Sequence, residues 1–368
     1  RCHVIFAASP IAMTIVAIMG AVSALFAATI ALFQYDIKRV LAYSTMSQLG
    51  YMFMAEGVGA NSSAIFHLTT HAFFKALLFM AAGGVIHALG GEQDMRKMGG
   101  LRKDLPITFW SFVIGGLALS GIPPLAGFWS KDAILGATLG QATTTGSTGN
   151  YALWIVGLLT ALLTGLYTFR LIFAVFYGER KGDVRGHAAH VHEVGMAMAT
   201  PMLILLALSV VGGFDGTPFG DAIGSFLKPA VGIPVAIASG GLLATSLTIG
   251  AVVALVGIGI AWQRYLVRPF TFRSNNNPLY RLLANAYYVD ALYGAVIVRP
   301  LLALGHGLNT LVEVKTLDDG SLGIAWLVGK ISEGLRRLQS GYARNYALGI
   351  LVGAVLIVLY YIIGPSGR

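Results

Sequence analysis

Long runs of apolar residues, separated by short polar links, follow one another along most of the 368-residue chain. The first run extends from about Ile11 to Phe33, the second from about Val40 to Gly59, and the third from Ser63 to Leu89. About 20 apolar residues are enough for one α-helix to cross the hydrocarbon core of a membrane. Because only helices and closed barrels satisfy their backbone polar groups in lipid, the pattern predicts an all-α polytopic membrane protein.

The apolar run that begins at Pro106 continues to about Leu139 and is too long for one membrane helix. A continuous helix of that length would extend about 50 Å, against a hydrocarbon core of about 30 Å. The segment 120–127, Ser-Gly-Ile-Pro-Pro-Leu-Ala-Gly, interrupts the run with residues that break or kink helices. We therefore expect one discontinuous helix, the kind of element on which transporters build ion sites.

The rest of the chain predicts four more spans and one long helix of different character. The approximate limits of the spans are Tyr151 to Tyr177, Met196 to Phe214, Leu242 to Trp262 and Ala347 to Ile363. From Arg264 to about Tyr342 we expect no window that is both long enough and free enough of charge to span, although apolar residues persist with helical spacing. This pattern predicts a long amphipathic helix along the membrane face or on partner subunits, with bends at Pro300 and near Asp319. A disordered tail is the alternative, and the apolar content argues against it.

Charge and cysteine content narrow the class of protein further. Only 11% of the residues are charged, against about a quarter in soluble domains. The net charge of +9 could suggest a nucleic-acid partner, but the basic residues gather in alternate links between spans, as membrane topology requires. The same bias places links such as 92–104 on the cytoplasmic side. The single cysteine, Cys2, excludes an internal disulfide and a cysteine-ligated zinc or iron–sulfur site within the chain.

Three ionisable residues, His67, His71 and Lys75, recur every fourth position in the third apolar run. This spacing places them on one slowly winding face of a helix. An ionisable group at membrane depth costs roughly 3 kcal/mol or more, so three together indicate a function. Imidazole can accept a proton on one nitrogen and release it from the other, which favours a proton relay. The alternative is that all three are core residues that hold neighbouring helices together.

The predicted helix break is followed by Trp-Ser-Lys-Asp at 129–132. We expect Ser130 to cap the second half-helix, with Asp132 in its first turn and Lys131 beside its positive end. Lys131 and Asp132 are then candidates for an ion route, and the alternative is a structural ion pair near the membrane surface. Arg170, in the last third of its span, is expected to reach toward the headgroups.

Two further features remain open at this point. Three loop histidines, His187, His190 and His192, could bind a metal ion, but a solvated loop is the simpler interpretation. Glu56 is an acid near a membrane face, and no motif assigns it a role.

Four stretches resemble the antiporter-like L subunit of respiratory complex I, NADH:quinone oxidoreductase (subunit 5 in mitochondria). They are Asp-Ile-Lys-Arg-Val-Leu-Ala-Tyr-Ser-Thr-Met-Ser-Gln-Leu-Gly-Tyr-Met at 36–52, His-Leu-Thr-Thr-His-Ala-Phe-Phe-Lys-Ala at 67–76, Glu-Gln-Asp-Met-Arg-Lys-Met-Gly-Gly-Leu at 92–101 and Gly-Phe-Trp-Ser-Lys-Asp at 127–132. The resemblance implies the second half of an antiporter-like proton-translocating bundle at 1–215, an additional span at 216–264, a lateral amphipathic helix at 265–342 and a transmembrane anchor at 343–368. It also implies that the chain, which begins with Arg1, is the C-terminal portion of a longer protein.

The function implied by this resemblance is proton translocation coupled to quinone reduction elsewhere in a complex. His67, His71 and Lys75 would form the central hydrophilic axis, and Lys131 with Asp132 would lie where the broken helix opens to the outer side. No cofactor or metal is expected in this chain; FMN, iron–sulfur clusters and quinone would belong to partner subunits. The expected partners are M-, N- and K-type antiporter-like neighbours and the lipid bilayer, with no nucleic acid, in a bacterial inner (plasma) membrane.

Several rival functions stay open on the sequence alone. The chain also resembles the A subunit of multisubunit Na⁺/H⁺ antiporters and the equivalent subunit of membrane-bound hydrogenases. A structural scaffold, with the polar residues as interhelical contacts, is a rival of a different class, and a free-standing channel is another.

Overall fold

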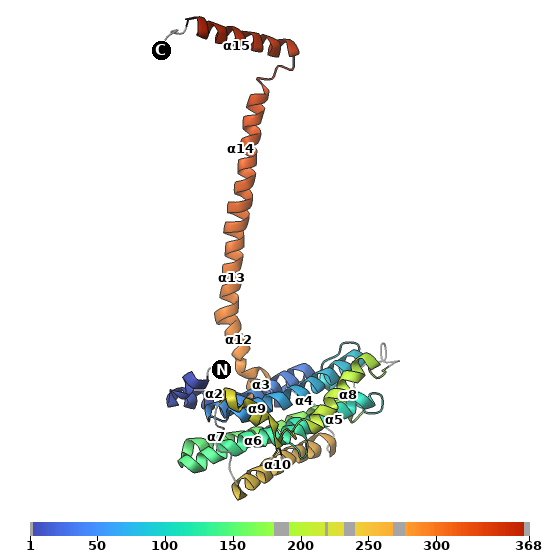
Figure 1. Ribbon diagram of the computed structural model, residues 1–368. Helices are drawn as coiled ribbons and strands as arrows, with labels where there is room; N and C mark the ends of the chain where they lie inside the picture. The colour runs from blue at the N-terminus through green and yellow to red at the C-terminus, as the bar shows by residue number, and fades with distance from the viewer. Residues whose placement is uncertain (1–2, 180–190, 218–219, 232–239, 268–276, 364–368) are drawn as a thin grey trace. The chain divides into compact units, whose positions relative to one another are not determined.

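The computed structural model describes residues 3–179, 191–217, 220–231, 240–267 and 277–363, and helices dominate them, as predicted. The one strand pair among these residues is antiparallel, Gly216–Thr217 (β1) with Gly220–Asp221 (β2). The α-helices (Figure 1) are α1 (His3–Ala7), α2 (Pro10–Phe33), α3 (Ile37–Gly57), α4 (Asn61–Ala88), α5 (Pro106–Ser120), α6 (Ala126–Thr145), α7 (Thr148–Phe176), α8 (Met196–Val211), α9 (Ala222–Val231), α10 (Gly241–Trp262), α11 (Pro278–Ala284), α12 (Val289–Tyr293), α13 (Arg299–Leu308), α14 (Asp319–Arg336) and α15 (Ala343–Ile363). The chain divides into two compact units, Arg1–Tyr287 and Tyr288–Arg368.

Six helical stretches among the described residues are long and apolar enough to cross a membrane, judged by length and composition. They are Pro10–Phe33, Asn61–Ala88, Thr148–Phe176, Gly241–Val267, Ala286–Leu308 and Ala343–Ile363. The stretch Ala286–Leu308 shows that one prediction was wrong, because we expected no such window between 264 and 342. Its only acidic, lysine or arginine residues are Asp290 and Arg299, and the nine-residue spacing leaves apolar sequence between them.

Helix α4 lies at the centre of the first unit, where it packs against α3, α5, α6 and α8. Its fully buried side chains Phe74, Leu77 and Leu78 belong to the main hydrophobic core of this unit. Helix α6 packs on α4 at one side and also contacts α7 and α10. The residues of α4 and α6 are therefore held among several helices, where a polar side chain must find its partners inside the protein.

The predicted break between two half-helices is present. Helix α5 ends at Ser120, where Gly121 takes a left-handed conformation (φ 80°), and α6 begins at Ala126. Glycine at position 127 allows the two half-helices to touch, because a Cβ atom there would overlap the carbonyl oxygen of Ala118. The second half-helix is longer than predicted and runs to Thr145.

Most of the segment 141–150, which lies between the predicted end of the half-helix near Leu139 and the predicted span from Tyr151, is therefore helical. The hydroxyls of Thr143, Thr144 and Thr145 donate hydrogen bonds to carbonyls three or four residues earlier in α6. Polar composition alone suggested a loop, but these side chains satisfy their hydroxyls on the helix itself.

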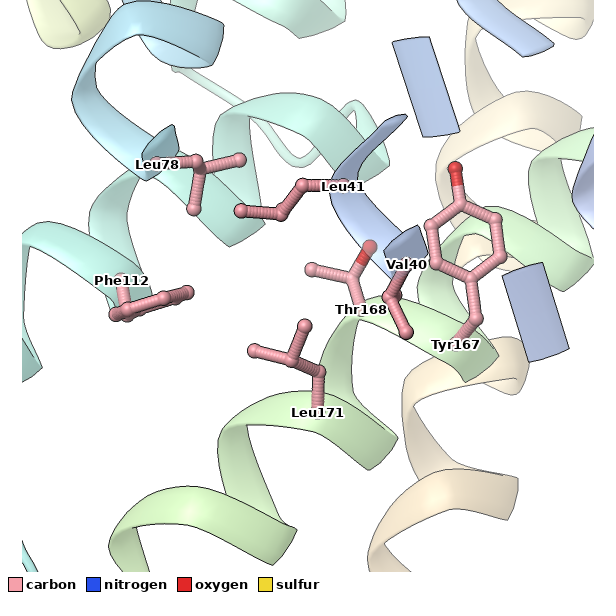
Figure 2. Close-up of a pocket in the computed structure, with 7 residues that line it drawn as sticks. All are labelled: Val40, Leu41, Leu78, Phe112, Tyr167, Thr168 and Leu171. Atoms are coloured by element: carbon pink, nitrogen blue, oxygen red, sulfur yellow. The ribbon is translucent and has the colours of Figure 1, made fainter. Parts of the chain in front are cut away.

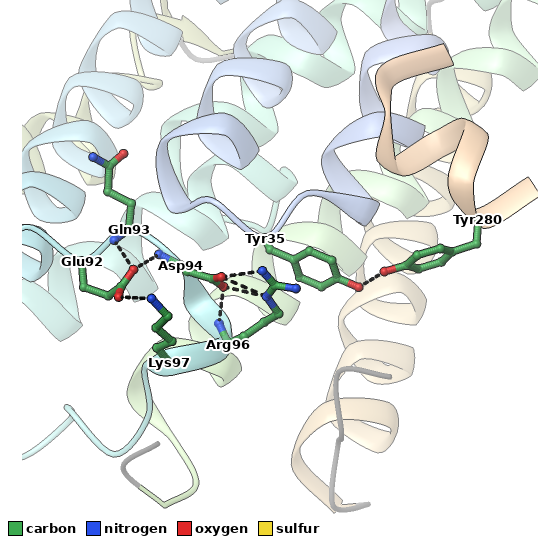
Figure 3. A network of polar contacts seen from close by, with 7 residues as sticks. All are labelled: Tyr35, Glu92, Gln93, Asp94, Arg96, Lys97 and Tyr280. Atoms are coloured by element: carbon green, nitrogen blue, oxygen red, sulfur yellow. Dashed lines mark hydrogen bonds and ion pairs between the residues drawn. The ribbon is translucent and has the colours of Figure 1, made fainter. Parts of the chain in front are cut away.

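Outside the spans, the link between α2 and α3 joins two other segments through one polar network (Figure 3). The hydroxyl of Tyr35 shares a hydrogen bond with that of Tyr280, the third residue of α11. The Arg96 guanidinium lies over the Tyr35 ring, 4.6 Å from its centroid, and pairs with Asp94 at 2.6 Å. Burial, together with the Tyr280 hydroxyl, raises the pKa of Tyr35 to about 12. The network connects α11 to the link 92–104.

In the second unit, helical backbone continues from Val289 to Arg336 through α12, α13, α14 and two π-helical stretches, Gly294–Val298 and Asn309–Asp318. This long helix confirms the predicted element. The two places where bends are expected, Pro300 and Asp319, lie where a π-helical stretch is followed by α13 or α14. Pro300 is the second residue of α13 and lies just after the π-helical stretch Gly294–Val298, where the regular α-helical hydrogen-bond pattern is already interrupted.

Candidate functional site

Helix α4 places His67, His71 and Lys75 on one face, and all three side chains are buried. Their exposed fractions are 0%, 6% and 5%, so these groups face protein and not lipid or water. The rings of His67 and His71 lie with their centroids 6.1 Å apart. The predicted alignment on one helix face is therefore present.

His67 is held from two other helices. Its Nε2 lies 3.2 Å from Oε1 of Gln48 on α3, and its Nδ1 lies 2.9 Å from the hydroxyl of Ser130 on α6. With the amide in this orientation Oε1 only accepts, so neutral His67 donates from Nε2 and accepts at Nδ1. The Ser130 hydroxyl also lies 2.6 Å from that of Thr70, which extends the chain of hydrogen bonds. Each ring nitrogen of His67 thus has a hydrogen-bond partner on a neighbouring helix.

Lys75 is held by the first turns of α3. Its Nζ donates to the carbonyl of Leu41 at 3.0 Å and to the hydroxyl of Ser44 at 2.5 Å, and it lies 5.5 Å from the centre of the Phe79 ring. A small apolar cavity of about 10 Å³ adjoins this place and shares Leu41 with it (Figure 2). Its lining residues are Val40, Leu41, Leu78, Phe112, Tyr167, Thr168 and Leu171. Ser44 of α3 is thus the side-chain partner of Lys75, as Gln48 is of His67, and the sequence analysis assigned neither of them a role.

His71 is the exception along this line. Its Nε2 is buried and has no hydrogen-bond partner among the described residues, and its ring packs edge-on against Phe74. The same residues include no hydrogen bond between His71 and either His67 or Lys75. The structure brings the three groups together but does not join them into one continuous hydrogen-bonded chain.

Lys131 lies in the second turn of α6, and its ammonium group reaches the C-terminal end of α5. Its Nζ donates to the carbonyl of Leu119 at 2.8 Å, in the last turn of α5, and lies 5.5 Å from the centre of the Tyr51 ring. The carbonyls of a last helical turn lack partners within the helix and carry partial negative charge. The ammonium group therefore sits at the negative end of α5, a contact that the sequence did not predict.

The predicted places of Ser130 and Asp132 were wrong, because α6 begins earlier than expected. The residue before its first turn is Leu125, so Ser130 lies inside the helix and is not its cap. Asp132 is then in the second turn and not the first. Helical side chains slant toward the N-terminus, which carries the Lys131 stem back to α5.

Asp132 does not pair with its neighbour in sequence. Its side chain is buried, and Oδ2 has no hydrogen-bond partner among the described residues. Adjacent residues on a helix point about 100° apart, and Asp132 faces Gly250 of α10 whereas Lys131 turns to α5. The alternative of a structural Lys131–Asp132 ion pair does not match this geometry.

Other candidate residues behave differently from expectation. Arg170 is buried and donates from Nη1 to the carbonyl of Gln34 at 2.8 Å, so it does not reach the headgroups as predicted. Its position on α7 faces the end of α2, where the last carbonyls have no partner within the helix. No cluster of three metal-binding side chains occurs among the described residues; His187 and His190 lie outside them. Glu56 is half-buried in the last turn of α3.

Comparison with known proteins identifies a family and several proteins to which this chain is similar. Residues 1–164 match the family described as NADH:quinone oxidoreductase/Mrp antiporter, TM. The chain is 40% identical to "NADH-quinone oxidoreductase subunit L" of Rickettsia bellii, over 98% of this chain and 56% of that protein. It is 42% identical to the subunit of the same name from Mycobacterium tuberculosis, over 95% of this chain and 54% of that protein. The chain thus spans about half the length of the curated relatives it matches.

A solved structure supports the architecture. The chain is similar to one in the "Structure of Mrp complex from Dietzia sp. DQ12-45-1b", with a TM-score of 0.58 and 21% identity, over 98% of this chain and 36% of that one. At this identity the likeness concerns the fold alone, and it confirms the predicted antiporter-like, all-α membrane fold. The sequence matches confirm the resemblance predicted from the motifs: residues 1–164 belong to the NADH:quinone oxidoreductase/Mrp antiporter family, and nearly the whole chain is similar to subunit L of NADH-quinone oxidoreductases.

Proposed function

We propose that this chain conducts protons as part of the membrane subunit L of a multisubunit NADH–quinone oxidoreductase. One observation carries the proposal: His67, Lys75 and Lys131 are buried in an apolar bundle and held by polar groups of other helices. None of these contacts is with a carboxylate. A purely structural contact could be made by uncharged side chains at much lower desolvation cost, so ionisable groups here favour proton transfer.

The proposed route uses the groups that the bundle collects around α4 and α6. Lys75 with Ser44, and His67 with Gln48, line the α3 side, whereas Ser130 connects His67 to α6 one residue before Lys131. A positive charge on one of these groups disfavours a second charge nearby, because buried charges interact strongly at low dielectric. This repulsion gives a means of coupling to chemistry in other subunits, and the proposal needs no redox group in this chain.

The proposed partners and location follow from the named relatives. Subunit L takes its name from an NADH–quinone oxidoreductase, so we place this chain beside M-, N- and K-type antiporter-like subunits in a bacterial plasma membrane. The large apolar side chains of the second unit, such as Leu301, Trp326 and Ile350, are exposed, and they suit contact with lipid or with those subunits. FMN, iron–sulfur clusters and quinone would then be held by partner subunits.

The test is Lys131→Ala in the full-length subunit within its assembled complex, scored for electron transfer to quinone and for proton uptake into vesicles. We expect fewer protons per electron at normal assembly, with or without slower electron transfer. Lys97→Ala is the matched control, because Lys97 is exposed and pairs with Glu92 outside the spans. Wild-type values for both activities in Lys131→Ala would refute the route and favour the scaffold. A requirement for Na⁺ in the pumping assay would instead favour the antiporter alternative.

A further inference from the structure

The buried carboxyl group of Asp132 lies against a helix to which the proposed function gives no role. If a Cβ atom were present at Gly250 of α10, it would lie 2.6 Å from Oδ1 of Asp132. Real Cβ atoms essentially never come so close to another heavy atom. The carboxyl group therefore occupies space that exists only because residue 250 is glycine.

The same face of α10 carries a second buried polar group. Ser246, Gly250, Ala254, Gly257 and Ala261 are the buried residues of this helix. Ser246 precedes Gly250 by four residues, so the two lie about one turn, roughly 6 Å, apart on that face. Its hydroxyl is fully buried and, like Oδ2 of Asp132, has no hydrogen-bond partner among the described residues. The buried face of α10 thus carries one unpartnered hydroxyl group and packs against one carboxyl group with an unpartnered oxygen.

We propose that α10 forms one wall of the proton route: Gly250 is a positioning residue that admits the Asp132 carboxyl group, and Ser246 is the next proton-exchanging group on that wall. This inference rests on the proposed function and extends it to a helix outside the segment 1–164 that the family description matches. In each transfer the Asp132 carboxyl group gives its proton to the Ser246 oxygen, the Ser246 hydroxyl proton leaves in the same step to a water molecule at the membrane face where α10 begins, and a proton from the Lys131 ammonium group then protonates Asp132 again. The net charge of the pair is unchanged once Asp132 is protonated again.

Neighbouring glycines of α10 supply matched controls. At Gly257 an added Cβ would overlap the backbone carbonyl of Leu162 on α7, which cannot move without the helix, and at Gly259 it would meet nothing within 4 Å. At Gly250 it would meet the free end of a side chain, which can rotate away. We therefore expect Gly250→Ala to move Asp132 with little loss of stability, Gly257→Ala to lower stability without moving Asp132, and Gly259→Ala to do neither.

The experiment is a double-mutant cycle in the full-length subunit within the assembled complex, with protons pumped per electron as the readout and thermal stability measured in parallel. We expect Gly250→Ala to lower the ratio, and to lower it no further when Asp132→Asn is already present, because coupled residues are not additive. The effects of Gly257→Ala and Asp132→Asn on the number of protons pumped per electron should be additive. Ser246→Ala should lower the ratio at unchanged stability.

The outcomes separate the two proposals. If Asp132→Asn lowers the ratio but Gly250→Ala and Ser246→Ala leave it at the wild-type value, the wall on α10 is refuted and the proposed function stands. If the effects of Gly250→Ala and Asp132→Asn add, Gly250 acts through packing and the inference is also refuted. If Lys131→Ala and Asp132→Asn both pump as wild type, the proposed function itself fails.

Discussion

Because α5 and α6 approach closely at Gly127, we predict that one methyl group added there will displace Lys131 from its hydrogen bond without touching it. Gly127 lies where α6 touches α5, and its substitution by alanine would place a Cβ atom on the carbonyl oxygen of Ala118. Both clashing atoms belong to, or are fixed by, the backbone, so the strain cannot be relieved by a side-chain rotation. The two half-helices must separate.

The size of the effect follows from the geometry at this contact. To reach the 3.0 Å that real Cβ contacts keep, the half-helices must part by roughly 1 Å, an overpacking strain of about 1–3 kcal/mol. A displacement of that size along the hydrogen bond lengthens the distance from Lys131 Nζ to Leu119 O from 2.8 Å to about 4 Å, beyond hydrogen-bonding range. A hydrogen bond to a charged group contributes about 1.5–3 kcal/mol, so the ammonium group loses its place at the end of α5.

The assay is proton pumping per electron in vesicles, with the full-length Gly127→Ala subunit in its complex and the thermal stability of that complex as the second measurement. We expect a pumping defect similar to that of Lys131→Ala, and a smaller additional loss when both changes are present. Gly83→Ala is the control, since the added Cβ would come no closer than 3.3 Å to a flexible Met198 methyl group. Wild-type pumping by an assembled Gly127→Ala complex would refute the reasoning that this contact positions Lys131.

Two further predictions concern other parts of the site. Gln48→Leu removes the acceptor of His67 Nε2 and leaves a buried donor unpaired, at a cost of about 1–3 kcal/mol, so thermal unfolding should show this loss and pumping should slow. Thr144→Val, on the exposed end of α6, removes one hydrogen bond within its own helix and should change neither. Outside the spans, the hydrogen bond from Lys97 and that from the backbone N–H of Asp94 lower the pKa of the Glu92 carboxyl group below 4.5. A lowered pKa gives stability that is present above the unfolded value and is lost as the pH falls through the folded one, so segment 92–97 should open to proteolysis only below about pH 4.5. Glu92→Gln should weaken this dependence on pH, and the remainder comes from Asp94, where burial is outweighed by the hydrogen bonds from Arg96, which lower the pKa of the carboxyl group.

The parts of the fold that could be predicted are those with a strong local signal. The apolar runs located α2, α4 and α7 to within a few residues, and Pro-Pro at 123–124 located the helix break, because lipid and proline act on each segment separately. The four-residue spacing of His67, His71 and Lys75 determined that they share a face. These inferences needed no knowledge of neighbouring helices.

The partners of these residues could not be predicted, because they depend on how helices distant in sequence pack. The acceptors of Lys75 on α3 lie more than 30 positions away, and the hydroxyl next to His67 comes from α6, 63 positions away. The burial of Arg170 had no local signal either, because it depends on the carbonyl at the end of α2. The sequence pattern identifies which buried polar residues need hydrogen-bond partners, and the packing of the helices determines which groups those partners are.

The separation of Lys131 from Asp132 favours a proton route over a structural role. Had the two side chains paired, they would have neutralised each other, and either charge would be stabilised mainly by its partner. The half-helix instead turns Lys131 to the carbonyls of α5 and Asp132 to α10, so each can gain or lose a proton without breaking an ion pair. Two adjacent ionisable groups that are buried without pairing give a scaffold no stability, because no ion pair offsets the desolvation cost of either group. A route for protons needs ionisable groups that are not locked into an ion pair with each other, and the broken helix keeps Lys131 and Asp132 apart in this way.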